Sequence, residues 1–105
     1  MKRVYVAHPY GGNEGNKTKV ESIVRTMVRT NPDILYISPI HAVGYLYNDV
    51  KYLVGMEYCF ELLRSCDELV LCEGWEDSRG CKLEKKFAEN NGIPIYYLGA
   101  SYVAI

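Results

Sequence analysis

Residues 66–98 read CDELVLCEGWEDSRGCKLEKKFAENNGIPIYYL, and two short apolar runs enclose a charged segment within this stretch. The apolar runs, residues 68–72 and 94–98, have the length and composition of strands. Residues 79–91 lie between them and carry apolar side chains at helical spacing, with Gly92 as the stop signal. A strand, a helix and a second strand in this order predict a parallel pair joined by a right-handed crossover.

The preceding part of the chain contains two further helical patterns. The first is amphipathic, opens near Asn16 and closes at Asn31-Pro32. The second spans residues 50–65. Its expected apolar stripe consists of Leu53, Met56, Phe60 and Leu63.

Two more apolar runs, residues 3–8 and 34–37, predict strands ahead of these helices. Residues 41–48 are expected to form a loop. Because strands and helices alternate and hairpin turns are absent, the sequence predicts an α/β fold with a mostly parallel sheet of four or five strands. Residues 100–105 are the candidate for the fifth, edge strand or for a contact between subunits.

The composition limits the classes of function. A chain of 105 residues holds one domain, residues 1–105, and its net charge of −1 provides no positive field for a nucleic acid. His8-Pro9 ends the first apolar run far short of a signal peptide or a membrane span, so a cytoplasmic location without membrane contact is expected. The cysteines form no C-x-x-C pair and are expected to be reduced, buried thiols: Cys59, Cys66, Cys72 and Cys81.

Parallel sheets bind ligands beyond the carboxyl ends of their strands, which makes residues 8–16, 38–49 and 73–80 the candidate loops. Glu84 lies near them, in the second turn of the helix predicted at 79–91, and is the one charge on its apolar stripe. Burial of an unpaired carboxylate costs several kcal/mol. The plain alternative is that Glu84 pairs with a lysine or accepts a hydrogen bond from a tyrosine. Burial would raise its pKa, whereas the positive end of the helix would favour the ionised form.

The spacing Ser78-x-Gly80-x-x-x-Glu84 between a strand and a helix, together with the first strand and glycine loop at residues 4–12, resembles the nucleoside 2-deoxyribosyltransferase-like superfamily. It is most similar to the small uncharacterised branch found in bacteria and their phages. The resemblance implies a flavodoxin-like three-layer sandwich that assembles as a homo-oligomer, a dimer or larger, and acts without a cofactor.

For this chain the resemblance implies an N-glycosidase or deoxyribosyltransferase that acts on a nucleoside or nucleotide. Glu84 would be the nucleophile that attacks the anomeric carbon, as in a retaining glycosidase. Ser78 and Gly80 would contact the sugar or a 5′-phosphate, and Trp75 would flank the base. The glycine loop would supply a second flat wall and backbone N–H groups through Tyr10, Gly11, Gly12 and Asn13.

One position departs from the family pattern. Active members carry an aspartate, the expected proton donor to the leaving base, where this chain has Cys59. Glu57 and Glu61 are nearby but are predicted to face solvent. Two further readings therefore stay open: a non-catalytic binding module for a nucleotide or nucleotide-derived signal, and an oligomeric interaction protein with a decayed site.

The two histidines have equally ambiguous roles. His8 ends the first strand, where it would donate to a phosphate or act as an acid, or simply bond loop backbone. His41 follows Ser38 at the end of the second strand, and both residues are candidate ligand contacts with the same ambiguity. No carboxylate or thiol is spaced to join the histidines, so no metal site is expected. Tyr45 and Tyr47 are expected to close the pocket or to form a subunit contact.

Overall fold

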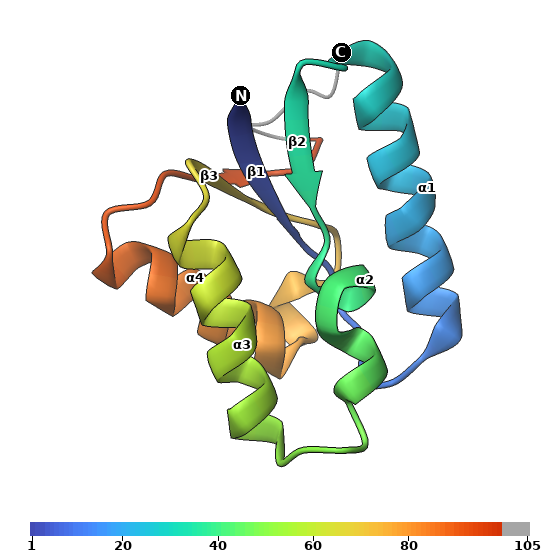
Figure 1. Ribbon diagram of the computed structural model, residues 1–105, viewed down its shortest axis with the longest axis vertical. Coiled ribbons are helices and arrows are strands. Elements are labelled where there is room, and N and C mark those ends of the chain that lie inside the picture. The colour runs from blue at the N-terminus through green and yellow to red at the C-terminus, as the bar shows by residue number, and fades with distance from the viewer. Residues whose placement is uncertain (100–105) are drawn as a thin grey trace.

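The computed structural model describes residues 1–99, which form a four-stranded, fully parallel sheet with helices on both faces (Figure 1). The predicted parallel α/β architecture is confirmed. The strand order is β2-β1-β3-β4. From β1 the chain adds β2 on one side and then crosses to add β3 and β4 on the other, so the order switches between β1 and β3. The strands are β1 (Lys2–Ala7), β2 (Ile34–Ile37), β3 (Glu68–Leu71) and β4 (Ile95–Tyr97). The candidate fifth strand at 100–105 lies outside the described residues.

The long helix α1 covers one face of the sheet, and α3 and α4 cover the other (Figure 1). The helical segments are α1 (Glu14–Thr30), α2 (Pro39–Val43), the 3-10 turn η1 (Gly44–Leu46), α3 (Tyr52–Arg64), the 3-10 turn η2 (Trp75–Asp77) and α4 (Arg79–Asn90). This gives the expected three layers. No helix within residues 1–99 is both long enough and apolar enough to span a bilayer.

Two apolar cores lie on either side of the sheet, and β1 contributes to both. Val4 and Val6 point toward α1, whereas Tyr5 and Ala7 point toward α3 and α4. All four are fully buried because both faces of a central parallel strand are covered. The alternation places the polar hydroxyl of Tyr5 between the sheet and α4, where it needs a hydrogen-bond partner. All four cysteines are free, three of them buried and Cys59 half-buried.

The loop after β1 is set by glycine and by a helix cap. Gly11 and Gly12 have φ values of +61° and +75°, a backbone region that favours glycine. Asn13 then caps α1, because its side-chain oxygen accepts a hydrogen bond from the Asn16 N–H at 3.1 Å. The helix therefore begins at Glu14, two residues before the predicted opening.

The loop predicted at residues 41–48 is wrong over its first half, which is helical. Ser38 caps α2 through its side chain, and Pro39 occupies the first helical position, where its missing N–H costs nothing. The chain continues directly into η1. A serine followed by proline is a helix-start signal, and it outweighed the glycine and tyrosine content that favoured a loop.

The apolar stripe predicted for α3 is correct at its centre and wrong at its start. Met56 and Leu63 are buried and Phe60 is half-buried, but Leu53 is 57% exposed. The inward face begins instead at Tyr52 and runs through Cys59. Leu53 therefore belongs to an outer apolar surface of the helix.

The different burial of two strand leucines predicts different losses of stability when each is replaced by alanine. Leu69 in β3 is fully buried, whereas Leu35 in β2 is 43% exposed. Leu69→Ala removes core contacts and leaves a cavity, so we expect it to lower the free energy of unfolding by about 2–5 kcal/mol. Leu35→Ala, the matched control, should cost less than about 1 kcal/mol. Denaturant unfolding of both variants measures the difference, and equal losses would contradict the described layers.

Candidate functional site

A cavity of about 660 Å³ opens beyond the carboxyl ends of β1 and β3, at the position predicted from the sheet topology. Its walls come from five parts of the chain: the loop after β1, the α2–η1 segment, the first half of α3, the segment after β3 and the start of α4. The volume is in the range of pockets that hold a drug-sized or nucleoside-sized ligand. Six of the residues singled out in the sequence line it: His8, Tyr10, Gly11, Ser78, Gly80 and Glu84.

Glu84 is the one buried charged side chain among residues 1–99, with 5% of its surface exposed. It lies at the centre of the inward face of α4, between buried Cys81 and Ala88, whereas Leu83 and Phe87 are only half-buried. Its carboxylate accepts a hydrogen bond from the Tyr5 hydroxyl and also lines the cavity. Glu84 was expected either to face the ligand site or to pair with a lysine or a tyrosine. It faces the cavity and also has a tyrosine partner, whereas it pairs with no lysine among residues 1–99.

The protonation of Glu84 is governed by burial. Desolvation raises the pKa of this carboxyl to about 7, although the hydrogen bond from Tyr5 acts in the opposite direction. The pKa of Tyr5 is raised well above its ordinary value by its own burial and by the charge of Glu84, so the hydroxyl stays protonated and donates.

Cys59 lies in the cavity wall close to this pair. Burial and the charge of Glu84 raise the pKa of its thiol to about 11, so the sulfur is a protonated thiol at neutral pH. Glu57 and Glu61, its acidic neighbours in sequence, are exposed, as predicted. The position where the family pattern has an acid is therefore part of the cavity but carries a very weak one.

Five other residues singled out in the sequence do not line the cavity. Asn13 caps α1. The Tyr47 ring covers Gly12 so closely that a Cβ atom added at Gly12 would lie 3.2 Å from ring carbons of Tyr47. Trp75 packs against Tyr97 on the sheet, with ring centres 5.5 Å apart. The remaining two are Ser38 and His41.

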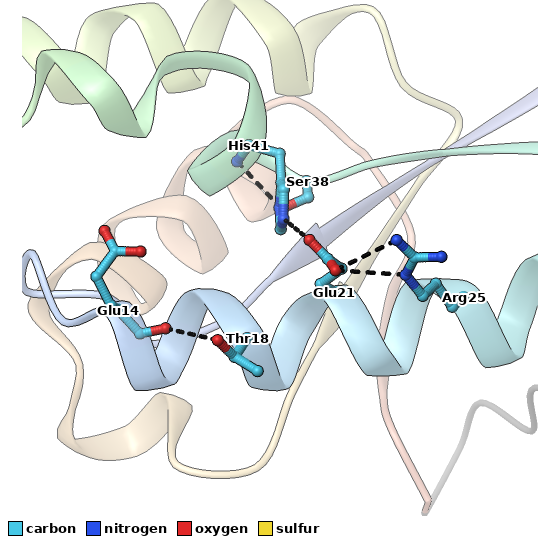
Figure 2. A network of polar contacts seen from close by, with 6 residues as sticks. All are labelled: Glu14, Thr18, Glu21, Arg25, Ser38 and His41. Atoms are coloured by element: carbon cyan, nitrogen blue, oxygen red, sulfur yellow. Dashed lines mark hydrogen bonds and ion pairs between the residues drawn. The ribbon is translucent and has the colours of Figure 1, made fainter.

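Ser38 and His41 form a brace between α2 and α1 (Figure 2). His41 Nδ1 lies 2.9 Å from the Ser38 Oγ, and Nε2 lies 3.2 Å from a carboxylate oxygen of Glu21 on α1. The hydrogen bond with His41 and the nearby charge of Arg25 lower the pKa of Glu21. These contacts hold the α2 wall of the cavity in place from behind it.

His8 lies in the cavity wall with one ring nitrogen already engaged. Its Nδ1 is 2.8 Å from the Pro9 carbonyl oxygen. A carbonyl can only accept, so Nδ1 carries a proton and Nε2 remains for other partners. The loop-backbone contact expected for His8 is present, and it orients the ring without removing it from the cavity.

An aromatic row lies along the cavity rim, and Tyr52 and Arg79 extend it beyond Tyr10 and Tyr47, the two members expected from the sequence. The Tyr10 and Tyr47 rings meet edge to face with centres 5.4 Å apart, and the Tyr47 and Tyr52 rings do so at 6.4 Å. The Arg79 guanidinium lies 4.7 Å from the centre of the Tyr52 ring. The expectation that Tyr47 closes the pocket agrees with this row, whereas Tyr45 is 76% exposed.

No cluster of three or more His, Cys, Asp or Glu side chains suited to a metal ion occurs within residues 1–99. The polar side chains in the cavity lining include His8, Lys51, Asp77, Ser78, Arg79 and Glu84, and the Tyr5 hydroxyl is bonded to Glu84. A buried carboxylate with a pKa near 7 is able to act as a nucleophile or as a proton carrier at neutral pH.

The comparisons with known proteins agree with the fold. The model of a family described as "Domain of unknown function (DUF4406)" matches residues 2–97. A solved structure of a 2-desoxiribosyltransferase from Leishmania mexicana is similar, with a TM-score of 0.69 and 17% sequence identity. The match covers 93% of this chain and 64% of that chain. The chain thus has a nucleoside deoxyribosyltransferase-like fold, which confirms the resemblance seen in the sequence. No curated protein sequence matches it.

The raised pKa of Glu84 predicts a pH-dependent stability. Between pH 4.5 and pH 7 the folded chain keeps the proton that the unfolded chain releases, so wild-type stability falls as pH rises through this window. Glu84→Gln keeps an acceptor for Tyr5 but has no charge. We therefore expect the free energy of unfolding of Glu84→Gln minus that of wild type to rise by up to about 3 kcal/mol from pH 4.5 to pH 7, because the wild type loses stability over this range.

Denaturant unfolding at several pH values measures this difference. The matched control is Glu89→Gln, an exposed glutamate on the same helix, which should leave the pH dependence of stability unchanged. A difference between Glu84→Gln and wild type that is flat between pH 4.5 and pH 7 would contradict the raised pKa of the buried carboxyl.

Proposed function

The chain belongs to the DUF4406 family, and we propose that it breaks the N-glycosidic bond of a nucleoside or nucleotide, with Glu84 as the nucleophile. One observation carries the proposal: the single buried carboxylate among residues 1–99 faces a nucleoside-sized cavity and is held by Tyr5. The similarity to a deoxyribosyltransferase fold supports the class of substrate. Whether the released glycosyl group passes to water or to a second base distinguishes a hydrolase from a transferase.

The first step of this reaction uses the ionised form of Glu84. A carboxylate oxygen attacks the anomeric carbon, the bond from that carbon to the base breaks, and its electron pair moves to the base nitrogen. The product is a glycosyl ester on Glu84. Water or a second base then attacks the same carbon, and the carboxylate leaves. Tyr5 donates its hydrogen bond to the carboxylate before and after this cycle, which orients the reacting oxygen.

The departing base needs a proton, and His8 is our candidate donor. The Cys59 thiol, with a pKa of about 11, holds its proton too tightly to give it efficiently at neutral pH. His8 lines the same cavity, and the Pro9 carbonyl orients its ring. A protonated Nε2 would donate to the base nitrogen as the glycosidic bond breaks.

The rim and the start of α4 supply the binding contacts in this proposal. Tyr10 and Tyr52 present aromatic surface to a flat base, in place of Trp75, which is packed elsewhere. Ser78 accepts the Cys81 N–H with its Oγ, so its own hydroxyl hydrogen is available to a sugar or 5′-phosphate oxygen. The backbone at Gly80 and the positive end of α4 favour an anionic group at the same place.

A second function, a binding module for a nucleotide or nucleotide-derived signal, has one observation in its favour. The acid that active members carry is replaced by the weakly acidic Cys59, although the cavity around it is intact. Such a module would use the same walls and would not consume its ligand. Product formation therefore separates the two functions.

We expect incubation with deoxynucleosides and their 5′-monophosphates to release free base, measured by chromatography. Glu84→Gln should abolish release, because an amide is not a nucleophile, and Glu89→Gln should retain it. With a nucleoside whose leaving base needs no added proton, the wild-type rate should rise with pH through about 7, as Glu84 ionises. Ligand binding without base release, unaffected by Glu84→Gln, would favour the binding module instead.

A separate variant tests the proton donor. We expect His8→Gln to lower the rate of base release by about 10²-fold while changing substrate affinity little, because the loss affects a proton transfer in the transition state. A nucleoside whose leaving base needs no added proton should be cleaved by wild type and His8→Gln at similar rates. Equal losses with both kinds of substrate would assign His8 to binding or to structure.

A further inference from the structure

Asn16 is the one side-chain amide in the cavity lining, among residues 1–99. It lies in the first turn of α1 and is half-buried. Neither the cap of α1 nor the proposed reaction uses its side chain. A carboxamide presents a hydrogen-bond acceptor and a donor side by side, the combination with which Asn and Gln recognise the edge of a nucleic-acid base.

Two hydrogen bonds fix the position of Asn16. Its backbone N–H donates to the Asn13 side-chain oxygen, and its Nδ2 donates to the Tyr10 carbonyl oxygen, each at 3.1 Å. Because a carbonyl can only accept, a half-turn of the amide would bring Oδ1 against the Tyr10 oxygen and lose this bond. The orientation of the amide is therefore set. Its Oδ1 and second Nδ2 hydrogen have no other partner within residues 1–99 and are available to a ligand.

Tyr10 is held in place as well, and its ring lines the same cavity. The ring meets that of Tyr47 edge to face, with centres 5.4 Å apart. On its other contact it lies so near η1 that a Cβ atom added at Gly44 would be 3.4 Å from it. One residue thus offers a flat apolar surface through its ring and orients a hydrogen-bonding amide through its carbonyl.

The fixed amide distinguishes two classes of base. Adenine and cytosine carry an amino group next to a ring nitrogen that accepts, whereas hypoxanthine, guanine, uracil and thymine carry a keto oxygen next to a ring N–H. An amino base would donate to Oδ1 and accept from Nδ2. A keto base would place oxygen against oxygen and N–H against N–H, so both hydrogen bonds would be lost. This edge points away from the glycosidic bond and leaves the atoms nearer that bond open to His8.

We propose that Asn16 determines base specificity and that the cavity selects nucleosides or nucleotides of adenine and cytosine over those with keto bases. The base lies against the Tyr10 ring, with its amino edge toward the Asn16 amide. This inference rests on the proposed function for the place of the base. It does not require that Glu84 breaks the glycosidic bond, because selection occurs on binding.

Two pairs of ligands that differ at this edge test the proposal. They are 2′-deoxyadenosine with 2′-deoxyinosine, and 2′-deoxycytidine with 2′-deoxyuridine. Isothermal titration calorimetry with Glu84→Gln, which keeps the cavity without the nucleophile, measures their dissociation constants. We expect the amino member of each pair to bind at least about tenfold more tightly. In the wild type, kcat/KM for base release should follow the same order. Equal affinities within the pairs, tighter binding of the keto members or no binding would overturn the proposal.

Removal of the amide tests the residue itself. In the Glu84→Gln background, Asn16→Ala should reduce the preference within each pair to about twofold or less, through weaker binding of the amino members. Asn13→Ala is the matched control, because Asn13 belongs to the same loop but does not line the cavity. It should lower the melting temperature, since α1 loses its cap, and should leave the preference unchanged. Equal changes of preference in both variants would overturn the role of the Asn16 amide.

The outcomes separate this proposal from the proposed function. Selective binding of amino nucleosides without release of base would support base selection by Asn16 and overturn the cleavage reaction alone. Release of base from all four nucleosides with the same kcat/KM would support the cleavage reaction and overturn the role of Asn16 alone.

Discussion

The buried contact between Tyr5 and Glu84 is the constraint on which the site depends. A carboxylate taken out of water costs several kcal/mol unless hydrogen bonds replace the water, and here one hydroxyl does so only in part. The remaining cost appears as the raised pKa of Glu84. A core built for stability alone would place an apolar residue at this point of α4, between Cys81 and Ala88. The carboxylate thus marks the floor of the cavity as a place where the chain accepts a loss of stability, a common feature of functional sites.

The parallel sheet fixes this contact through the alternation of β1. Val4 and Val6 pack beneath α1, so Tyr5 between them points to the opposite face of the sheet, and the pairing of β1 fixes its position along the strand. Its partner β3 leads into the turn that begins α4, and the Ser78 cap sets where that helix starts. The hydroxyl and the carboxylate meet because both positions are set by backbone pairing and capping. The apolar cores therefore also determine the geometry of the polar site.

Local pattern predicted the elements of this fold better than their contacts. The strand at residues 34–37 and the inward placement of Glu84 follow from periodicity, which depends on near neighbours. The Tyr5–Glu84 contact joins residues 79 positions apart, and its register depends on strand pairing that no local window contains. One signal was present: a hydroxyl within an otherwise apolar buried strand needs a partner. Trp75 and His41 lie near strand ends but outside the cavity lining, because closeness to a strand end does not determine which way a side chain turns.

The thiol at position 59 has a consequence for the carboxylate beside it. Two carboxylates in one buried site repel each other, so one of them stays protonated to a higher pH. The Cys59 thiol is neutral at physiological pH, and Glu84 is the one buried carboxylate among residues 1–99. A second acid would push the pKa of Glu84 further from neutrality. With a neutral thiol at position 59, no second carboxylate raises the pKa of Glu84 beyond about 7. In the proposed function the proton for the leaving base therefore comes from His8, whose ring the Pro9 carbonyl orients.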